Sequence, residues 1–377
     1  MQQNEIIDKI TEEFYWFHRH PELSYEEVET TKRLRQDLQA ADIKILDLPL
    51  QTGLVAEVGT GKAPYVALRC DIDGLPIHEA SGLSYASEHE GRMHACGHDF
   101  HISTVLGAAY LLKEQEAELP GTVYLIFQPA EEAPGGARKV LETGVLKEVQ
   151  AIFGLHTSPL YDVGTLGIRA GAVTASVDKF TVTFHGKGTH AAHPERGIDP
   201  IVMAASFVTA AQSIVARNID PAHPGLISIT HIESGNTWNV IPESSWLEGT
   251  VRCLTADDRK LIKKRIYGLA EGQAASFGGH AELTWYAGPP ATNNTPSWTE
   301  FAAEEARKAG LTVEPAPVNL AGEDFAYYQE EIPGAFVLVG TGKSPANHNP
   351  KFHVDPAALG PAARYMADLA CEAFARL

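Results

Sequence analysis

Four short stretches of the sequence combine side chains that bind metal ions with side chains that transfer protons. Residues 93–99 hold Cys96 and His98, a thiol and an imidazole two positions apart, with Gly97 between them to let the backbone bend. Asp99 follows at a position that suits the N-cap of a helix. Taken alone, such a Cys-x-His pair is more typical of an ordinary loop than of a metal site.

The second stretch places two carboxylates side by side. Glu131 and Glu132 follow an apolar run and lie between Pro129 and Pro134. The chain need not stay extended there, so both carboxylates can face one cleft instead of opposite sides of a strand. One could bind a metal ion while the other accepts a proton from water. Two solvated loop glutamates are the alternative.

The third and fourth stretches place histidines after apolar runs. His156 follows residues 151–155, and His348 and His353 follow another run, so that either of these two could be a ligand. Together, the four stretches offer sulfur, nitrogen and oxygen donors for two divalent ions, a mixture that suits Zn, Co, Ni or Mn better than Mg or Ca. Two ions about 3.5–4 Å apart can hold a water molecule and polarise a carbonyl. The pattern therefore indicates metal-assisted hydrolysis.

These stretches need a scaffold that brings them together. Apolar strand-like runs alternate with helical periodicity, which is typical of an α/β fold with a mostly parallel sheet covered on both faces. Ligand sites in such sheets gather at the carboxyl ends of the strands. The expected strands are residues 65–72, 122–128, 151–156 and 335–340, and the main expected helices are residues 5–18, 25–41, 100–115, 297–309 and 358–376.

A segment in the middle of the chain has a different texture. Its expected order is β-α-β-β-α-β, which is ferredoxin-like. The strands are residues 179–184, 225–232, 245–252 and 281–286, and the helices are residues 200–216 and 256–277. We expect a catalytic metal-binding domain in two parts, residues 1–175 and 291–377, with a smaller α+β domain, residues 176–290, inserted between them.

Composition narrows the class of protein. A chain of 377 residues exceeds what one hydrophobic core usually takes, and a formal charge of −18 argues against nucleic acid or an anionic membrane as a partner. The N-terminus lacks the basic and apolar regions of a secretory signal, and no apolar run is expected to cross a bilayer. The four cysteines have no paired spacing, which favours free thiols in the cytoplasm.

One nucleotide-binding pattern is incomplete. Residues 340–344, Gly-Thr-Gly-Lys-Ser, follow an apolar run in the way that a phosphate-binding loop does. The pattern needs a glycine where the chain has Val337, and Pro345 and Pro350 interrupt any helix that would follow. The sequence therefore argues against a nucleotide site.

The chain resembles the metal-dependent N-acyl-amino-acid amidohydrolases. These include aminoacylases, hippurate hydrolase, plant auxin-conjugate hydrolases and bacterial N-acetylcysteine deacetylases, and they are related to carboxypeptidase G and the dipeptidases. The likeness runs from end to end. The matching segments are residues 20–24 (HPELS), 71–76 (DIDGLP), 93–99 (MHACGHD), 127–132 (FQPAEE), 188–192 (GTHAA), 239–242 (NVIP), 322–325 (GEDF) and 348–350 (HNP).

The resemblance implies a role for each matching residue of the catalytic domain. Glu131 would be the general base that activates water and later protonates the leaving amine. Asp73 and Asp99 would be carboxylates that support the metal ligands from behind. The ligands of two divalent ions would be Cys96, as a bridging thiolate, His98, Glu132, His156 and His348.

The inserted domain resembles the family's lid and dimerisation domain. His190 would donate to the developing oxyanion across a dimer interface, and Asn239 and Arg252 would bind substrate. Arg252 could pair with the amino-acid carboxylate through its planar fork, although an ion pair with nearby Glu248 is the alternative. Thr189 stands where many relatives have glycine, so the geometry of that loop is expected to differ.

These observations predict hydrolysis of small N-acetyl or N-benzoyl amino acids to a carboxylic acid and a free amino acid, by a homodimer. A metallo-dipeptidase or carboxypeptidase is the nearer alternative. Asp71 and Cys96 argue against it, since the dipeptidase branch has histidine and aspartate there. A metal-binding protein without catalysis is the other alternative, and the Glu131–Glu132 pair argues against that. The remaining histidines of these segments, His94, His101, His193 and His353, receive no firm role.

Overall fold

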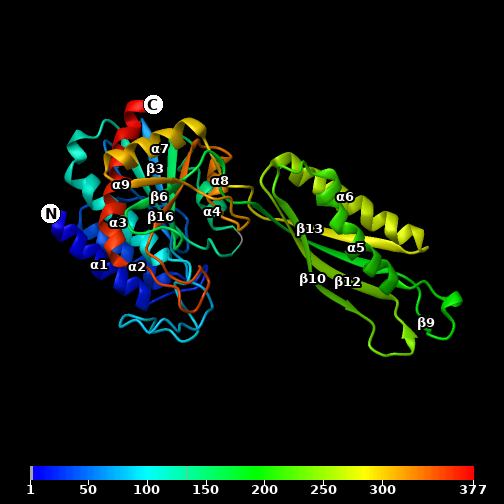
Figure 1. Ribbon diagram of the computed structural model, residues 1–377. Helices are drawn as coiled ribbons and strands as arrows, with labels where there is room; N and C mark the ends of the chain where they lie inside the picture. Colours follow the sequence, from blue (N-terminus) through cyan, green and yellow to red (C-terminus); the bar gives the residue numbers. More distant parts are fainter. Residues whose placement is uncertain (1–2, 134) are drawn as a thin grey trace. The chain divides into compact units, whose positions relative to one another are not determined.

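The computed structural model describes residues 3–133 and 135–377, which form two compact units (Figure 1). The first contains the described residues up to Val173, with Asn293–Pro317 and Asp324–Leu377; the second contains Thr174–Thr292 and Val318–Glu323. The short segment 318–323 was expected in the catalytic domain. It belongs to the second unit because the Ala175 N–H donates to the carbonyl oxygen of Ala321.

An eight-stranded sheet forms the centre of the first unit, in the order β1-β2-β4-β3-β5-β16-β6-β15. The four predicted strands are β3, β4, β5 and β16, which pair in parallel, so the predicted mostly parallel sheet is confirmed. The antiparallel pairs, β1–β2, β2–β4 and β16–β6, lie toward the two edges, and each includes at least one strand that the sequence did not predict. The bounds are β1 Lys44–Ile45, β2 Leu54–Gly59, β3 Tyr65–Asp71, β4 Thr122–Gln128, β5 Val149–Ser158, β6 Thr165–Ile168, β15 Thr312–Pro315 and β16 Gly334–Gly340.

Helices cover both faces of this sheet. One face carries α1 (Gln3–Arg19), α2 (Val28–Ala40), α3 (His98–Glu114), α7 (Pro296–Lys308) and α9 (Leu359–Ala373). The other carries the short helices α4 (Gly136–Glu142) and α8 (Ala326–Gln329). Short 3-10 turns lie at Glu116–Glu118, Pro356–Ala358 and Phe374–Arg376, and β7 (Gly171–Ala172) pairs with β14 (Asn293–Asn294).

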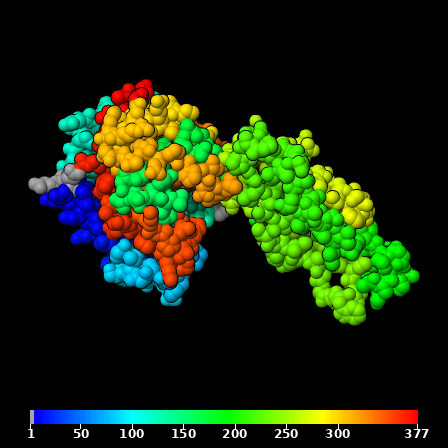
Figure 2. Space-filling view, viewed as in Figure 1, coloured from blue at the N-terminus to red at the C-terminus, as the bar shows by residue number. Residues whose placement is uncertain are grey.

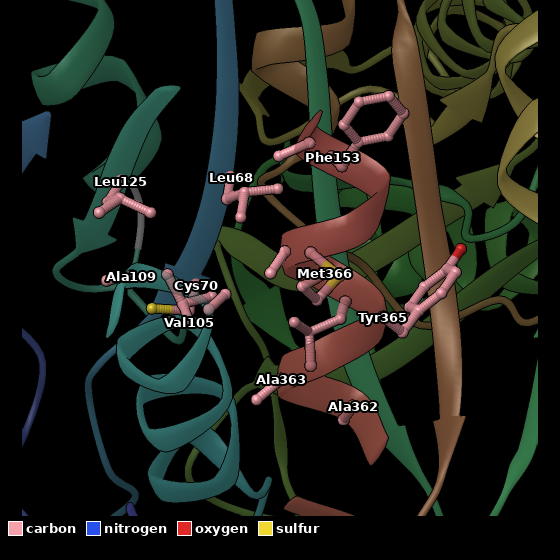
Figure 3. Close-up of a cluster of buried hydrophobic side chains, with 14 of the residues drawn as sticks. Leu68, Cys70, Val105, Ala109, Leu125, Phe153, Ala362, Ala363, Tyr365 and Met366 are labelled. Atoms are coloured by element: carbon pink, nitrogen blue, oxygen red, sulfur yellow. The ribbon is translucent and has the colours of Figure 1, made fainter. Parts of the chain in front are cut away.

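The core between α3, α9 and the sheet fixes the position of the loops at the strand ends. Leu68, Leu125 and Phe153 come from three neighbouring strands and are fully buried against Val105 of α3 and Met366 of α9 (Figure 3). Burial of each such side chain contributes about 1.5–3 kcal/mol. Because α3 begins at His98, this packing also places a candidate metal ligand.

Two distant loops of the first unit meet at its surface. The space-filling view shows residues near 80, in light blue, beside residues near 350, in orange-red (Figure 2). The Ala80 N–H donates to the carbonyl oxygen of Pro350 at 2.7 Å. This contact ties the segment that carries His348 to the loop that follows β3. No helix follows the Gly-Thr-Gly-Lys-Ser segment before Pro356, in agreement with the argument against a phosphate-binding loop.

The second unit has the predicted ferredoxin-like order. Its antiparallel sheet runs β10-β12-β8-β13, and α5 and α6 pack on one face. A small ribbon of β9 and β11 projects from it, with a 3-10 turn at Pro194–Arg196. The bounds are β8 Ser176–His185, β9 Thr189–His190, α5 Pro200–Asn218, β10 Gly225–Ser234, β11 Val240–Ile241, β12 Ser244–Cys253, α6 Ala256–Ser276 and β13 His280–Ala287.

Helix α5 corrects one expectation. By length and composition it is apolar enough to cross a membrane, although the sequence was expected to contain no such run. Its buried residues, Met203, Phe207, Ala211 and Ile214, recur with helical spacing and pack against the sheet of the second unit. The core of this unit therefore accounts for one face of α5, while Ile201 and Val202 of the same helix are exposed.

Candidate metal centre

Six of the predicted site residues lie together at the carboxyl end of the sheet of the first unit. They come from the loop before α3, the first residue of α3, the loop after β4, strand β5 and the loop after β16. Their ligating atoms form overlapping groups of three, within 4.8 Å of one another in each group: Cys96, His98 and His156; Cys96, Glu132 and His348; His98, Glu131 and Glu132.

Two histidine rings each turn one nitrogen toward this cluster. His98 Nδ1 lies 3.2 Å from Asp73 Oδ1, and His156 Nδ1 lies 2.8 Å from a backbone carbonyl. Both contacts place the N–H of a neutral ring at Nδ1, which leaves the lone pair on Nε2. His98 Nε2 is buried without a hydrogen bond to any described residue, and His156 Nε2 lies 3.3 Å from Cys96 Sγ. Both Nε2 atoms are therefore suited to bind an ion.

The chemistry of the donor set fits a divalent cation. Burial raises the pKa of the Cys96 thiol well above its ordinary value, and the charges of Glu132 and Glu131 raise it further. A thiol in such surroundings becomes a thiolate when a metal ion takes the place of its proton. His348 Nε2 lies 3.2 Å from Glu132 Oε1, and this contact raises the pKa of His348. Sulfur, nitrogen and oxygen donors together suit first-row ions.

Asp73 contacts both the candidate ligand His98 and the loop after β4 that carries Glu131 and Glu132, here called the glutamate loop. Besides facing His98, its carboxylate accepts the hydroxyl of Ser24 at 2.6 Å and the N–H groups of Glu131 and Glu132 at 3.1 and 2.9 Å. Burial alone would raise the pKa of Asp73, but the hydrogen bonds from His98 and Ser24 hold it below the ordinary value. Asp73 therefore stays ionised and fixes the ring of His98, as a carboxylate behind a ligand does.

The loop after β4 turns through a left-handed residue. Ala130 has a φ of 51°, a conformation that costs a residue with a side chain about 1–2 kcal/mol. Its N–H donates to Glu27 Oε1 at 2.8 Å, so three successive N–H groups bind two buried carboxylates. This turn allows Glu131 and Glu132 to face the same side. Glu27 was missed because nothing in its spacing connects it with a loop more than a hundred residues later.

Thr157 joins three segments of the centre. Its N–H donates to His101 Nε2 and its hydroxyl donates to the carbonyl oxygen of Cys96, both at 2.8 Å. His101 Nδ1 lies 2.5 Å from Asp71 Oδ1, and burial lowers the pKa of His101 to about 3. The neutral ring therefore uses both nitrogens and keeps none for an ion. His101, which received no role from the sequence, supports the ligand-bearing backbone.

A fully buried arginine explains two further matching segments. Arg69 lies 2.8 Å from Asp71 Oδ2 and 2.6 Å from Asp324 Oδ1. Asp324 also accepts the side-chain amide of Gln128 and the N–H of Ala137. A buried ion pair of this kind is strongly destabilised by loss of one partner. The network thus fixes the end of β4 and the start of α4 on both sides of the glutamate loop.

The N-cap prediction for Asp99 is wrong. Helix α3 begins at His98 with Gly97 at the cap position, so Asp99 lies inside the first turn. Its carboxylate lies 2.6 Å from His18 Nδ1, and His18 Nε2 lies 3.2 Å from Glu79. Burial alone would lower the pKa of His18, but Asp99 and Glu79 raise it to about 9. Asp99 thus anchors α3 to α1 and makes no hydrogen bond to a predicted ligand among the described residues.

The other histidines without a predicted role lie apart from the cluster. Neither ring nitrogen of buried His94 has a hydrogen-bond partner among the described residues, and burial lowers its pKa to about 4. His353 is half-buried, with Nδ1 3.2 Å from the carbonyl oxygen of Lys351. His193, in the second unit, faces Glu195 at 3.6 Å.

His190 and Asn239 lie side by side in the second unit. The Ala191 N–H donates to the carbonyl oxygen of Asn239 where β9 pairs with β11. His190 is exposed, and its Nδ1 accepts the N–H of Ala192 at 3.0 Å. The neutral ring therefore carries its proton on Nε2 and can donate it in a hydrogen bond.

Thr189 fits this ribbon despite the expected departure from glycine. It pairs with Ile241, and its methyl group fills the space above Gly197, where a Cβ atom would lie 2.5 Å from Thr189 Cγ2. The larger side chain at position 189 is thus matched by a residue without one at position 197.

Arg252 does not form the ion pair that was considered for it. Glu248 pairs with Lys179 at 2.6 Å, and the carboxylate of Asp178 accepts hydrogen bonds from Nε and Nη2 of Arg259. Arg252 donates from Nε to a threonine hydroxyl, and burial lowers its pKa. Its guanidinium makes no ion pair within 4.0 Å in the described part of the chain, which leaves its fork available for an anionic ligand.

Comparison with known proteins identifies the family. Residues 67–372 match the profile described as peptidase family M20/M25/M40. The chain is 47% identical to an N-acetylcysteine deacetylase of Bacillus subtilis over 355 residues, 94% of this chain and 93% of that protein. It is 41% identical to the IAA-amino acid hydrolase ILR1-like 5 of Arabidopsis thaliana over 365 residues, 94% of this chain and 84% of that protein.

The fold is also similar to that of a solved structure. The YxeP protein of Bacillus subtilis, described as a dinuclear metal binding peptidase, superposes with a TM-score of 0.91 at 42% identity, over 99% of this chain and all of that one. The chain belongs to peptidase family M20/M25/M40. Membership confirms the predicted metal-dependent amidohydrolase and the predicted fold class.

We predict that Glu27 acts on catalysis through the glutamate loop. Glu27→Ala would leave the Ala130 N–H buried without an acceptor, at about 1–3 kcal/mol, and would displace Glu131. The expected result is a fall in kcat of about ten- to a hundredfold with KM little changed, measured with saturating metal.

Two variants control this test. Glu27→Gln keeps an acceptor oxygen and should restore most of the activity, while Ala130→Gly removes the strain of the left-handed residue and should leave kcat near wild type. Equal losses in Glu27→Ala and Glu27→Gln would contradict the role proposed for this hydrogen bond.

We also predict a pH-dependent contribution of His18 to stability. Its folded pKa of about 9 lies above its ordinary value of 6.5, so the stabilisation is complete below pH 6.5 and is lost as the pH rises through 9. The difference in free energy of unfolding between wild type and His18→Gln should therefore decrease between pH 6.5 and 9.5, as measured by urea titrations. His353→Gln is the control, because no carboxylate lies within 4.0 Å of this histidine among the described residues, and a difference for His18→Gln that does not change with pH would refute the prediction.

Proposed function

We propose that this chain hydrolyses the amide bond of small N-acyl amino acids. The convergence of Cys96, His98, Glu132, His156 and His348 beside Glu131 is the observation that carries the proposal. The five would hold two divalent ions with Cys96 between them, since one thiolate can bridge two metals. Relatives named for N-acetylcysteine, N-acetyldiaminopimelate and indoleacetyl-amino acids share the feature of an acylated amino acid, which supports the substrate class.

Glu131 is the proposed proton carrier. When bound, the ions supply Lewis acidity that polarises the acyl carbonyl and acidifies the attacking water. Glu131 accepts a proton from that water as the water oxygen attacks the carbonyl carbon. Glu131 then delivers the proton to the amine nitrogen as the C–N bond breaks. Water and amide thus yield a carboxylic acid and a free amino acid. Asp73 keeps Glu131 and its neighbour in place through their backbone N–H groups.

Residues of the second unit are proposed to bind the substrate. His190, with its proton on Nε2, would donate to the carbonyl oxygen as negative charge develops there. The unpaired fork of Arg252 suits the α-carboxylate of the amino acid, and Asn239 would contact the same substrate. The proposed assembly is a homodimer through the second unit, in which His190 serves the partner's centre.

The identity of the metal and the location of the protein are also proposals. The mixed donors favour Zn, Mn, Co or Ni. All four cysteines are free, which supports the cytoplasm as the compartment. The net charge of −18 supports a small-molecule partner and argues against nucleic acid and anionic membranes.

A carboxypeptidase is the second candidate. Relatives named thermostable carboxypeptidase 1 and 2, from Saccharolobus solfataricus, are 36% and 37% identical to this chain. The same centre would cleave a peptide bond by the same chemistry, so only the acyl side of the substrate separates the two functions. The paired glutamates argue against a metal protein without catalysis, because a structural ion needs no adjacent base.

Replacement of the base should abolish turnover without loss of metal. Glu131→Gln removes the proton acceptor, and kcat for N-acetyl amino acids should fall by about 10²–10⁴-fold. Metal content, measured by atomic emission after dialysis, should match wild type, whereas the matched variant Glu132→Gln should lose metal as well as activity. Undiminished turnover in Glu131→Gln would exclude Glu131 as the base.

A substrate panel separates the two candidate functions. N-acetyl and N-benzoyl amino acids should have the highest kcat/KM, and dipeptides with a free amino group should be poor substrates. N-acetyl amino acid amides lack the carboxylate, so they should be cleaved equally poorly by wild type and by Arg252→Gln. Preference for dipeptides would favour the peptidase, and full activity on the amides would exclude the pairing with Arg252.

A further inference from the structure

A second group of metal-binding side chains lies in the second unit. His185 ends β8, and His280 and Glu282 lie at the start of β13. Phe184 and Ala281, which alternate with them, pack in the core under α5 and α6. Because side chains alternate along a strand, His185, His280 and Glu282 share the face of the sheet opposite to these helices. None of the three is a predicted residue of the catalytic centre.

The register of the two strands brings the three side chains together. His185 and His280 are direct partners across β8 and β13, and their rings stack with centroids 4.5 Å apart and planes 10° apart. Glu282 is two residues further along, on the same face, with Oε2 3.5 Å from His185 Nε2. One ligating atom of each residue lies within 4.8 Å of the others.

Hydrogen bonds do not account for this arrangement. His185 Nε2 is a buried atom without a hydrogen bond to any described residue. A buried polar atom that is left unpaired has lost its hydration without compensation. Glu282 Oε2 lies 3.5 Å from this nitrogen and forms no hydrogen bond with it, whereas His223 Nδ1 of the same unit lies 2.9 Å from Asp258 Oδ2. The unsatisfied nitrogen points to a ligand that the protein itself does not supply.

We propose that His185, His280 and Glu282 form a further site for a first-row divalent transition ion such as Zn²⁺. Two imidazoles and one carboxylate are a known donor set for zinc, with water completing the coordination. An ion there would link β8 to β13, the strand at the edge of this sheet. The site is independent of the catalytic centre, and it would be retained in a variant such as Glu131→Gln.

Metal stoichiometry tests the proposal on the full chain. Equilibrium dialysis against Zn²⁺, followed by atomic emission, should show one ion fewer per chain in His280→Ala than in wild type. His223→Ala is the matched control, because it removes a histidine with a carboxylate neighbour from the same unit, and it should bind as many ions as wild type. Glu282→Ala should also lose affinity for this ion. Equal stoichiometry in all four proteins overturns the proposal.

Hydrogen exchange gives a second readout that does not depend on activity. Zn²⁺ added to wild type should slow exchange of the backbone amides of β13, and this protection should be absent in His280→Ala and present in His223→Ala. Protection that persists in His280→Ala would place the ion elsewhere and would also overturn the proposal.

Discussion

The carboxylate of Asp73 is the interaction on which the candidate centre depends. It faces His98 Nδ1 and accepts the hydroxyl of Ser24 and the N–H groups of Glu131 and Glu132, so one buried charge orients a candidate ligand and the backbone of both neighbouring glutamates. Removal of this carboxylate would leave several buried donors without an acceptor. Such a loss is far larger than that of a single hydrogen bond, because each orphaned group carries its own desolvation penalty.

Much of the donor set could be predicted because its chemistry is local. Cys96 and His98 are separated by one glycine, Glu131 and Glu132 are adjacent, and His156 and His348 lie in or after apolar strands that a parallel sheet brings to one edge. The supporting partners could not be predicted in this way. Glu27 accepts a hydrogen bond from Ala130, and His101 accepts one from Thr157. The partners are far apart along the chain, and no spacing pattern in the sequence indicates these contacts. The resemblance to the family predicted a supporting role for Asp73, but it did not predict that Asp99 pairs with His18.

The fold was predictable where strands are buried on both faces. Continuous apolar runs marked β3, β4, β5 and β16, and the β-α-β-β-α-β order marked the second unit. The strands β1, β2, β6 and β15 were missed: β1, β6 and β15 have only two to four residues each, and β1 and β15 form the two edges of the sheet, where burial constrains the sequence less. Helix α5 is long and apolar enough to cross a membrane, although the sequence was expected to contain no such run. Apolar length alone does not distinguish a helix of a folded domain from a membrane span.

The position of β16 has a consequence for biosynthesis. This strand lies between β5 and β6 in the sheet, although the whole second unit separates it from them along the chain. During translation, the ferredoxin-like unit leaves the ribosome complete while the larger sheet still lacks an inner strand and α9. The nascent first unit therefore exposes unpaired edges of β5 and β6 until β16 has been synthesised, and such edges favour aggregation or chaperone binding. The segment that carries His348 follows β16, so a chain that stops before this strand would also lack one of the proposed metal ligands.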